Sequence, residues 1–228
     1  ACAGPPGAPG RPRALWPWIN GNTDLPEITH EREEAKAKGM GGFDIWDIRP
    51  VVDEDKVVPP GHAFMGPESV KAIAHAIKDS VVCSLARAND RDIARAAEAL
   101  HGGAATRIHV FIATSEIHRT YKLQMAKEEI IRRAVDSIRL ARSLCLDVEF
   151  SAEDASRTEP AYLAEVVTAA IEAGASTINI PDTLGYTVPD EYFSLFRYLA
   201  EHVKGVGGVT LSVHCHDDLG MAVANSLA

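Results

Sequence analysis

Two histidines near the end of the sequence have a spacing that suits a metal ion. His214 and His216, with Cys215 between them, close the apolar run VTLSVHCH at residues 209–216. Side chains two residues apart on a strand point to the same face, so both imidazoles can reach one ion while Cys215 faces the covering helices. Neutral imidazoles suit zinc, manganese, iron or cobalt, whereas a hard ion would need added carboxylates. Histidines that only hydrogen-bond at the end of a strand account for the pattern equally well.

Carboxylates follow this pair and also lie at a second strand end. Asp217 and Asp218 come directly after the histidines and could bind the ion or orient its ligands. Ser151 and Glu153, in FSAED, share the two-residue spacing, which aims a hydroxyl and a carboxylate in one direction. Glu153 could serve as an acid, as a base or as a holder of a substrate hydroxyl. The alternative is a solvated loop or a helix start, which is the commoner role of exposed acids.

Other polar residues close the remaining apolar runs. Thr183 could donate a hydrogen bond to a substrate carboxylate or cap the next segment. His109 lies inside the apolar run RIHVFIAT, where a hydrogen-bonded core histidine is the commoner outcome. Arg87 could hold an anionic substrate or pair with an acid. The basic stretch TSEIHRTYK at residues 114–122 could bind a phosphate-bearing cofactor or form a solvated face.

These residues belong to a regular alternation of short apolar runs and long amphipathic segments. Runs rich in Val, Ile and Phe are typical of parallel strands that are covered on both faces. We predict five strands, at residues 81–86, 107–114, 147–151, 176–182 and 209–216. Helical periodicity predicts helices at residues 67–79, 90–100, 127–144, 160–173 and 189–203, and the start of another after residue 216.

Repeated βα units are compatible with a (β/α)8 barrel or with an open doubly wound sheet. The Gly-rich turn of a dinucleotide-binding fold is absent after every predicted strand, which argues against the second architecture. The candidate residues also gather at strand ends, where a barrel has its active site. We therefore predict an α/β fold of the (β/α)8 TIM-barrel type.

The composition excludes several classes of protein. The net charge of -9 over 228 residues disfavours a nucleic-acid binder that neutralises phosphates. No apolar run approaches the roughly eighteen residues that a membrane-spanning helix needs. The four cysteines form no close pair, so they suggest neither a disulfide framework nor a zinc knuckle. A reduced, cytoplasmic location is the default expectation.

The composition also divides the chain. Nine of the 13 prolines and all three tryptophans lie in residues 1–60. We therefore treat residues 1–60 as an atypical Pro/Trp-rich segment of uncertain order. Residues 61–228 are predicted to form a partial TIM-barrel catalytic domain.

Five motifs, in the same order, resemble the bacterial 2-isopropylmalate synthases. This family belongs to the metal-dependent, Claisen-condensing TIM-barrel enzymes, which also include the homocitrate and citramalate synthases. The resemblance runs from Pro67 to Ala228. It rests on VCSLARAN, RIHVFIATSEIH, DVEFSAEDASRTEP, AGASTINIPDTLGYTVP and LSVHCHDDLGMAVANSLA.

The resemblance implies an acyltransferase that condenses acetyl-CoA with 2-oxoisovalerate in the first step of leucine biosynthesis. It implies a divalent metal (Mn, Mg or Zn) on His214 and His216, which would polarise the ketone as a Lewis acid. It places Glu153, beside Ser151, and His109 in the substrate pocket. It assigns the keto-acid carboxylate to Thr183. Small-molecule substrates and a homodimer of the full-length enzyme follow from the same resemblance.

The chain also departs from the family pattern. The family's first strand ends in an Arg-Asp-Gly-Glu-like motif that supplies a metal-binding aspartate, and residues 1–60 contain no such motif. DIWDIRP at residues 44–50 stands roughly where the second strand belongs, but it matches poorly. The asparagine ligand that follows the eighth strand is also missing. Strands three to seven are therefore recognisable, whereas the first and eighth are not.

We expect this chain to be an inactive fragment with unpaired sheet edges, which are an aggregation hazard. We hypothesise that residues 1–60 are a mis-translated or foreign segment joined near Gly66. Homocitrate synthase or citramalate synthase is the alternative within the same class of enzyme. A TIM-barrel metal hydrolase also uses a His-x-His pair, but there the pair usually closes the first strand. A non-catalytic partial barrel is the alternative outside enzymes.

Overall fold

A computed structural model describes residues 13–19, 30, 33–34, 37, 42–48 and 67–228. The chain divides into two compact units, residues 1–84 with 95–107 and residues 85–94 with 108–228. Most of the Pro/Trp-rich segment lies outside the described residues. The hypothetical junction near Gly66 lies outside them as well.

The first unit contains two strands that the sequence did not predict as a pair. Strand β1 (Arg13–Ile19) and strand β2 (Gly42–Ile48) form a parallel two-stranded sheet. Strand β2 overlaps DIWDIRP, the segment that stood where a second strand was expected. Strand β1 has the sequence RALWPWI and contains no acidic residue. The family's metal-binding motif therefore has no counterpart on this strand.

Helix α2 (Pro67–Ala76) follows in the same unit. Its apolar residues recur every three to four positions, and Ile73 and Ala74 are buried. The first βα unit of the larger sheet comes next.

Five strands form the larger sheet, and their order in space is their order in the sequence. Neighbouring strands from β4 to β7 run parallel. The strands are β3 (Val82–Arg87), β4 (Thr106–Ala113), β5 (Val148–Glu153), β6 (Thr177–Asp182) and β7 (Thr210–Cys215).

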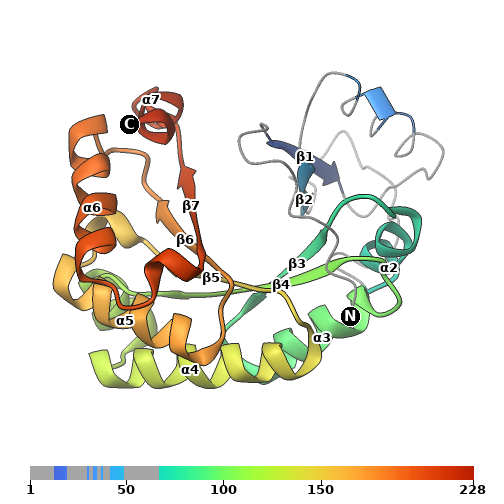
Figure 1. Cartoon of the computed structure of the whole chain (residues 1–228), viewed down its shortest axis with the longest axis horizontal. Coiled ribbons are helices and arrows are strands. Elements are labelled where there is room, and N and C mark those ends of the chain that lie inside the picture. Colours follow the sequence, from blue (N-terminus) through green and yellow to red (C-terminus); the bar gives the residue numbers. More distant parts are fainter. Residues whose placement is uncertain (1–12, 20–29, 31–32, 35–36, 38–41, 49–66) are drawn as a thin grey trace, which may run out of the picture. The chain divides into compact units, whose positions relative to one another are not determined.

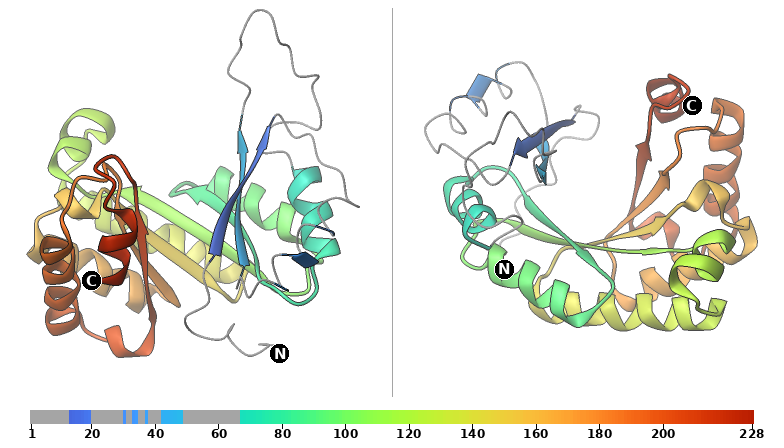
Figure 2. Two further views of the ribbon diagram at one scale, coloured as in Figure 1. Left: turned by 90° about the horizontal axis from the view of Figure 1, so that it is seen from above. Right: turned by 180° about the vertical axis from the view of Figure 1, so that it is seen from behind.

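A helix follows each strand of the larger sheet. Figures 1 and 2 show α4, α5 and α6 lying side by side along one face of strands β4 to β7. The helices are α3 (Asp90–Leu100), α4 (Lys127–Leu144), α5 (Pro160–Ala173), α6 (Pro189–His202) and α7 (Ala222–Leu227). The predicted strands and helices are thus confirmed to within three residues at each end, except that the last helix begins at Ala222 rather than directly after residue 216.

The core lies between these helices and the strands beneath them. On β5, Val148, Phe150 and Ala152 are fully buried, while the alternate residues face the other side of the sheet. Ile130, Ala134, Ile138 and Ala141 form the matching buried stripe on α4. This alternation explains why apolar spacing predicted the elements so well.

Local signals also set the ends of the helices. Pro160 and Pro189 occupy the first helical positions of α5 and α6, where the missing N–H costs nothing. Gly174 ends α5 with a positive φ of 112°. Three short elements were not predicted: the π-helix η1 (His118–Leu123) and the 3-10 turns η2 (Ala155–Arg157) and η3 (Val206–Gly208).

The larger sheet is open in the part of the chain that the structure describes, with β3 and β7 at its edges. It therefore holds five consecutive βα units of an incomplete (β/α)8 barrel, as the sequence predicted. None of the helices described here is both long and apolar enough to cross a membrane.

Candidate functional site

The two predicted metal-binding histidines lie together at the end of β7. The Nε2 atoms of His214 and His216 are 3.1 Å apart. Their rings stack with centroids 5.0 Å apart and planes inclined by 24°. The intervening Cys215 lies on the opposite face, against Tyr192 of α6, and burial together with this thiol raises the pKa of Tyr192. The predicted alternation of these three side chains is therefore present in the structure.

The separation of the two ring nitrogens suits a shared metal ion. With metal–nitrogen bonds of about 2.1 Å, it corresponds to an N–metal–N angle of about 95°. This angle is close to that between neighbouring ligands in octahedral coordination. A hydrogen bond between one protonated and one unprotonated ring nitrogen has the same length. The Nε2–Nε2 distance is therefore compatible with a shared metal ion and with a direct hydrogen bond between the rings.

Further ligands are lacking around the pair. Among the described residues, no third imidazole, thiol or carboxylate joins His214 and His216 with all ligand atoms within 4.8 Å of one another. The neighbouring Asp217 accepts a hydrogen bond of 2.9 Å from the backbone N–H of Ala222, the first residue of α7. Asp217 therefore caps a helix. The donor set fits two positions of a metal site and leaves the others to be filled.

A row of hydrogen bonds joins His109, Ser151 and Asn179 across β4, β5 and β6. The Nε2 atom of His109 lies 2.6 Å from the Oγ atom of Ser151, and the Nδ2 atom of Asn179 donates to the same Oγ over 2.8 Å. Ser151 and Asn179 are buried and His109 is half-buried. His109 is thus hydrogen-bonded, as in the commoner outcome expected for it, within a polar layer on the face of the sheet away from α4 to α6.

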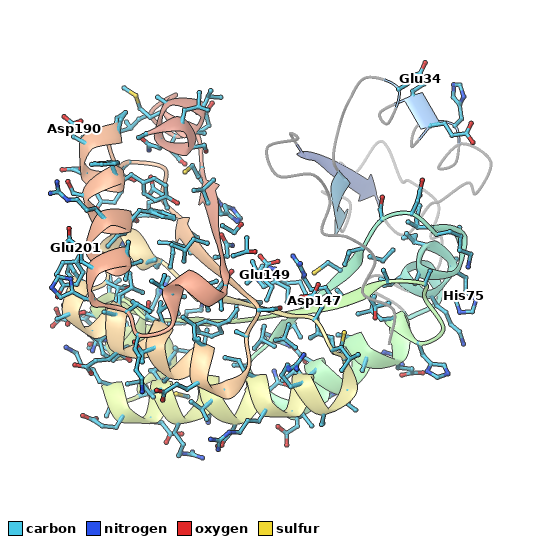
Figure 3. All side chains as sticks on the ribbon, in the orientation of Figure 1. Glu34, His75, Asp147, Glu149, Asp190 and Glu201 are labelled. Atoms are coloured by element: carbon cyan, nitrogen blue, oxygen red, sulfur yellow. The ribbon has the colours of Figure 1, made fainter. Side chains whose placement is uncertain are left out.

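The position of Glu149 indicates which ring nitrogen of His109 carries the proton. Figure 3 shows this residue on the same face of the sheet, and its Oε1 atom lies 3.7 Å from Nδ1 of His109. A carboxylate at that position favours a proton on Nδ1, which leaves Nε2 to accept a hydrogen bond from Ser151. The Oδ1 atom of Asn179 is buried and has no hydrogen-bond partner. An unpartnered buried acceptor is a place for a donor from water or a ligand.

Asp154 organises the loops above this layer. Its carboxylate is fully buried, and Ser115 donates to Oδ2 over 2.5 Å. Arg157 approaches the same carboxylate to 2.7 Å, and this hydrogen bond, more than the opposite charge, raises the pKa of Arg157. Nδ1 of His118 lies 3.7 Å from Oδ2. One carboxylate therefore ties the end of β5 to the loop that follows β4.

The backbone of Asp154 reaches a third strand. Its N–H donates to the Oγ1 atom of Thr183 over 3.0 Å, so Thr183 still has its own hydroxyl proton to donate. Asp154 adopts a left-handed conformation with φ of 66°, which is uncommon outside glycine but is tolerated by aspartate. This conformation turns the chain sharply just after Glu153.

Glu153 is half-buried and pairs with a lysine. The Nζ atom of Lys122, in the π-helix η1, lies 2.8 Å from Oε1 of Glu153. Insertions of one π turn are found at functional sites more often than elsewhere. The pairing holds Glu153 at the loop between β4 and α4, so this acid is neither a helix cap nor a fully solvated side chain.

The rest of the basic stretch also pairs with acids. Arg119 is buried, and its guanidinium donates two hydrogen bonds of 2.8 and 3.0 Å to Glu159. Lys127 contacts the same carboxylate at 3.0 Å, and both cations lie 4.8 Å from the ring centre of Tyr162. Burial raises the pKa of Tyr162 to about 12. The stretch therefore joins two loops. Arg119 is buried and so does not belong to a solvated face, whereas the Lys122 side chain remains 51% exposed.

Arg87 lies at the end of β3, where its guanidinium is bound to an acid of the following helix. Its Nε atom lies 2.5 Å from Oδ2 of Asp92, and its side chain is 72% exposed. The hydrogen bond lowers the pKa of Asp92 and raises that of Arg87. The structure thus shows the simpler of the two roles that the sequence allowed for this arginine.

The central role of Asp154 in holding these loops together was not predicted from the sequence, because an acid that follows a strand is usually solvated. The spacing of Asp154 and Arg157 was the available signal, since residues three apart meet in one turn of helix.

The comparisons with known proteins bear on this arrangement. A family model described as HMGL-like matches residues 52–228. This chain belongs to the HMGL-like family.

Several curated relatives of this HMGL-like chain are named 2-isopropylmalate synthase. It is 59% identical over 162 residues to the 2-isopropylmalate synthase of Methylacidiphilum infernorum. It is 58% identical over 161 residues to the 2-isopropylmalate synthase of Methylibium petroleiphilum. Each alignment covers 71% of this chain but only 32% and 31% of the relative, so the chain spans about a third of their length.

Solved structures share the fold at low sequence identity. The hydroxymethylglutaryl-CoA lyase of Pseudomonas aeruginosa gives a TM-score of 0.64 at 18% identity, over 95% of this chain and 72% of the lyase. The HMG-CoA lyase of Bacillus subtilis gives 0.65 at 16% identity, over 96% and 73%. The deoxyribose phosphate aldolase of Aeropyrum pernix gives 0.55 at 16% identity, over 94% and 81%. These likenesses support the fold alone.

Gly185 fixes the approach of the loop after β6 to the histidine pair, and its replacement tests this contact. A Cβ atom at Gly185 would lie 2.6 Å from the backbone C and O atoms of His216, and its φ is 62°. We expect Gly185→Ala to lower the free energy of unfolding by more than about 2 kcal/mol, through backbone strain and a contact that cannot relax. Urea unfolding followed by circular dichroism measures this loss.

The matched control is Gly207→Ala, where nothing lies within 4 Å of the added Cβ. We expect this variant to change stability by less than about 0.5 kcal/mol. Equal effects of the two substitutions would show that the close approach to His216 is unimportant.

The pairing of Glu159 predicts a dependence of stability on pH. Burial opposes ionisation, but hydrogen bonds from its own backbone, Lys127 and Arg119 outweigh it, so the pKa of Glu159 lies below the ordinary value. The stabilisation is therefore present above about pH 4.3 and is lost as pH falls through the folded-state pKa. Glu159→Gln should flatten this acid-side loss in urea midpoints measured across that range. Glu201→Gln, at an exposed glutamate of α6, serves as the control, and identical pH profiles for both variants would contradict the prediction.

Proposed function

We propose that this chain carries part of the catalytic barrel of a 2-isopropylmalate synthase. The reaction condenses acetyl-CoA with 2-oxoisovalerate, hydrolyses the thioester and releases 2-isopropylmalate and CoA. It would take place in the cytoplasm as the first committed step toward leucine. The main support is the 59% identity over 162 residues, together with the HMGL-like match over residues 52–228, which includes every candidate residue of this site.

The histidine pair would hold the metal. His214 and His216 present their Nε2 atoms 3.1 Å apart, which suits two neighbouring positions around Mn, Mg or Zn. When bound, a divalent ion supplies Lewis-acid polarisation of the ketone of the 2-oxo acid. The family pattern adds an aspartate and an asparagine, and neither has a counterpart here.

The other residues would bind and orient the 2-oxo acid. Thr183 keeps its hydroxyl proton available for the carboxylate, because its oxygen accepts from Asp154. His109 and Ser151, together with Asn179, offer a fixed polar layer beneath. Glu153, held by Lys122, would contact substrate at the mouth of the pocket. Positioning of this kind is worth more than any single contact, because reacting groups must meet in one geometry.

A second candidate is a partial barrel without catalytic activity of its own. The observation that favours it is the incomplete ligand set: within the described residues, the histidine pair has no third partner of the required type. We therefore propose that the isolated chain turns over its substrates far more slowly than a full-length relative. The homocitrate and citramalate synthases remain alternatives for the 2-oxo acid.

Metal titration tests the half-complete site. We expect Mn²⁺ or Zn²⁺ to bind the purified chain with a Kd weaker than micromolar, because two imidazoles satisfy only part of the coordination shell. The weak binding should disappear in His214→Ala and persist in His202→Ala, which removes an exposed histidine of α6. Calorimetric titration measures this, and micromolar or tighter binding that depends on His214 would contradict it.

A chimera tests the proposed function. Residues 67–228 of this chain would replace the matching segment of the Methylacidiphilum infernorum synthase, which supplies everything else that its reaction needs. We expect CoA release with 2-oxoisovalerate that exceeds release with 2-oxoglutarate or pyruvate. The same chimera with His214→Ala is the control.

The opposite results would overturn the proposal. A chimera that folds but prefers 2-oxoglutarate or pyruvate would replace the assigned substrate. A folded chimera with no activity toward any of the three would favour the non-catalytic alternative.

A further inference from the structure

The register of the sheet places Glu149 directly opposite His109. These two residues are Cα partners across β4 and β5, and Ser151 and Asn179 are partners across β5 and β6. Paired residues of neighbouring strands point to the same face, and so do residues two apart on one strand. The four side chains therefore form one row by the geometry of the strands alone. Each of the three strands has a neighbour on both sides, so the row does not depend on an edge of the sheet.

Burial makes the direction of the hydrogen bonds in this row important. Glu149 is 8% exposed, Ser151 is 5% exposed and Asn179 is 4% exposed, so water does not readily replace a missing partner. Within the described residues, His109 and Asn179 are the partners of the Ser151 hydroxyl. A hydroxyl has one proton and two lone pairs, so Ser151 donates to only one of the two. The direction of the bond at one side therefore fixes the direction at the other.

The carboxylate of Glu149 sets that direction. An ionised carboxylate only accepts hydrogen bonds, and its Oε1 atom lies 3.7 Å from Nδ1 of His109. A proton on Nδ1 therefore faces an acceptor, whereas an unprotonated Nδ1 would face the carboxylate with a second lone pair. The unprotonated Nε2 then accepts the proton of Ser151 over 2.6 Å. The serine oxygen accepts in turn from Nδ2 of Asn179 over 2.8 Å.

The opposite direction would reverse the last group of the row. With the proton on Nε2 of His109, Ser151 would accept from the ring and would have to donate its own proton to Asn179. The amide would then turn, so that Oδ1 received this proton and Nδ2 was left without a partner. In the structure Oδ1 is the group without a hydrogen-bond partner, and it is buried. The protonation of His109 and the orientation of the Asn179 amide are thus coupled.

We propose that Glu149 is a positioning residue that acts through His109 and Ser151 on Asn179. It holds His109 neutral with the proton on Nδ1, so that the row ends in an acceptor, the Oδ1 atom of Asn179. The group that fills this place must bring a donor, as a water molecule or a hydroxyl does and a ketone or carboxylate oxygen does not. The use of the row in substrate binding rests on the proposed function, whereas the arrangement of its protons does not.

Nitrogen NMR of the whole chain tests this arrangement and needs neither substrate nor metal. In ¹⁵N-labelled protein, two-bond ¹H–¹⁵N correlations distinguish a protonated ring nitrogen from an unprotonated one, and His109→Gln identifies the signals of this ring. At neutral pH we expect Nδ1 of His109 to be protonated and Nε2 to be unprotonated. Protonation of Nε2, either alone or together with Nδ1, would overturn the proposal.

Two variants show whether Glu149 is the cause. Glu149→Met keeps a similar volume without the acceptor, and Nε2 can then donate to Ser151. We expect the proton to move from Nδ1 to Nε2 of His109 and the side-chain amide signals of Asn179 to shift. In Ser151→Ala the carboxylate remains, so the proton should stay on Nδ1. Glu201→Met, at an exposed glutamate of α6, is the matched control and should change neither set of signals.

The contrary results are distinct. A proton that stays on Nδ1 in Glu149→Met, or that leaves Nδ1 in Ser151→Ala, would show that another group sets the tautomer and would refute the inference. If Glu149→Met does not fold, which the dispersion of its spectrum shows, the unmodified chain and Ser151→Ala still decide. An inactive chimera with the expected signals contradicts the proposed function alone, and an active chimera with contrary signals contradicts this inference alone.

Discussion

Asp154 carries a fully buried carboxylate, and a buried carboxylate needs hydrogen-bond partners. Its oxygens are satisfied by Ser115 and Arg157, and its backbone N–H by Thr183. Loss of any of these partners would leave polar groups buried without compensation, at a cost of about 1–3 kcal/mol each. The ends of β4, β5 and β6 are therefore held together by a residue that is itself not placed among the substrate-binding groups.

Ion pairs between successive loops extend this principle. Lys122 meets Glu153, and Arg119 meets Glu159, so the segment after β4 is fastened to the segment after β5 at two points. Both cations that the sequence offered for a phosphate-bearing cofactor are ion-paired in this way. The strand ends are thus held by contacts between neighbouring βα units as well as by the Asp154–Arg157 pair within one of them.

Periodicity in the sequence predicted the strands and helices because each element buries one face, and apolar residues recur at the buried positions. The shared direction of the His214 and His216 side chains was predicted because residues two apart on a strand point to the same face. Asp154 and the π-helix at His118–Leu123 did not follow. A left-handed aspartate has no composition signal, and partners such as Ser115 lie far away along the chain. Arg87 was ambiguous because a sequence cannot show that Asp92 lies within reach.

The order of the strands in space has a consequence for how the protein forms. Paired residues of neighbouring strands lie 40 positions apart for Ile108 and Val148, 28 for Glu149 and Thr177, and 33 for Thr177 and Thr210. Each strand can therefore dock on its predecessor as soon as it leaves the ribosome, with a similar loop-closure entropy at every step. Because β4, β5 and β6 precede β7 in the chain, synthesis releases the residues of the polar layer before the histidine pair of β7.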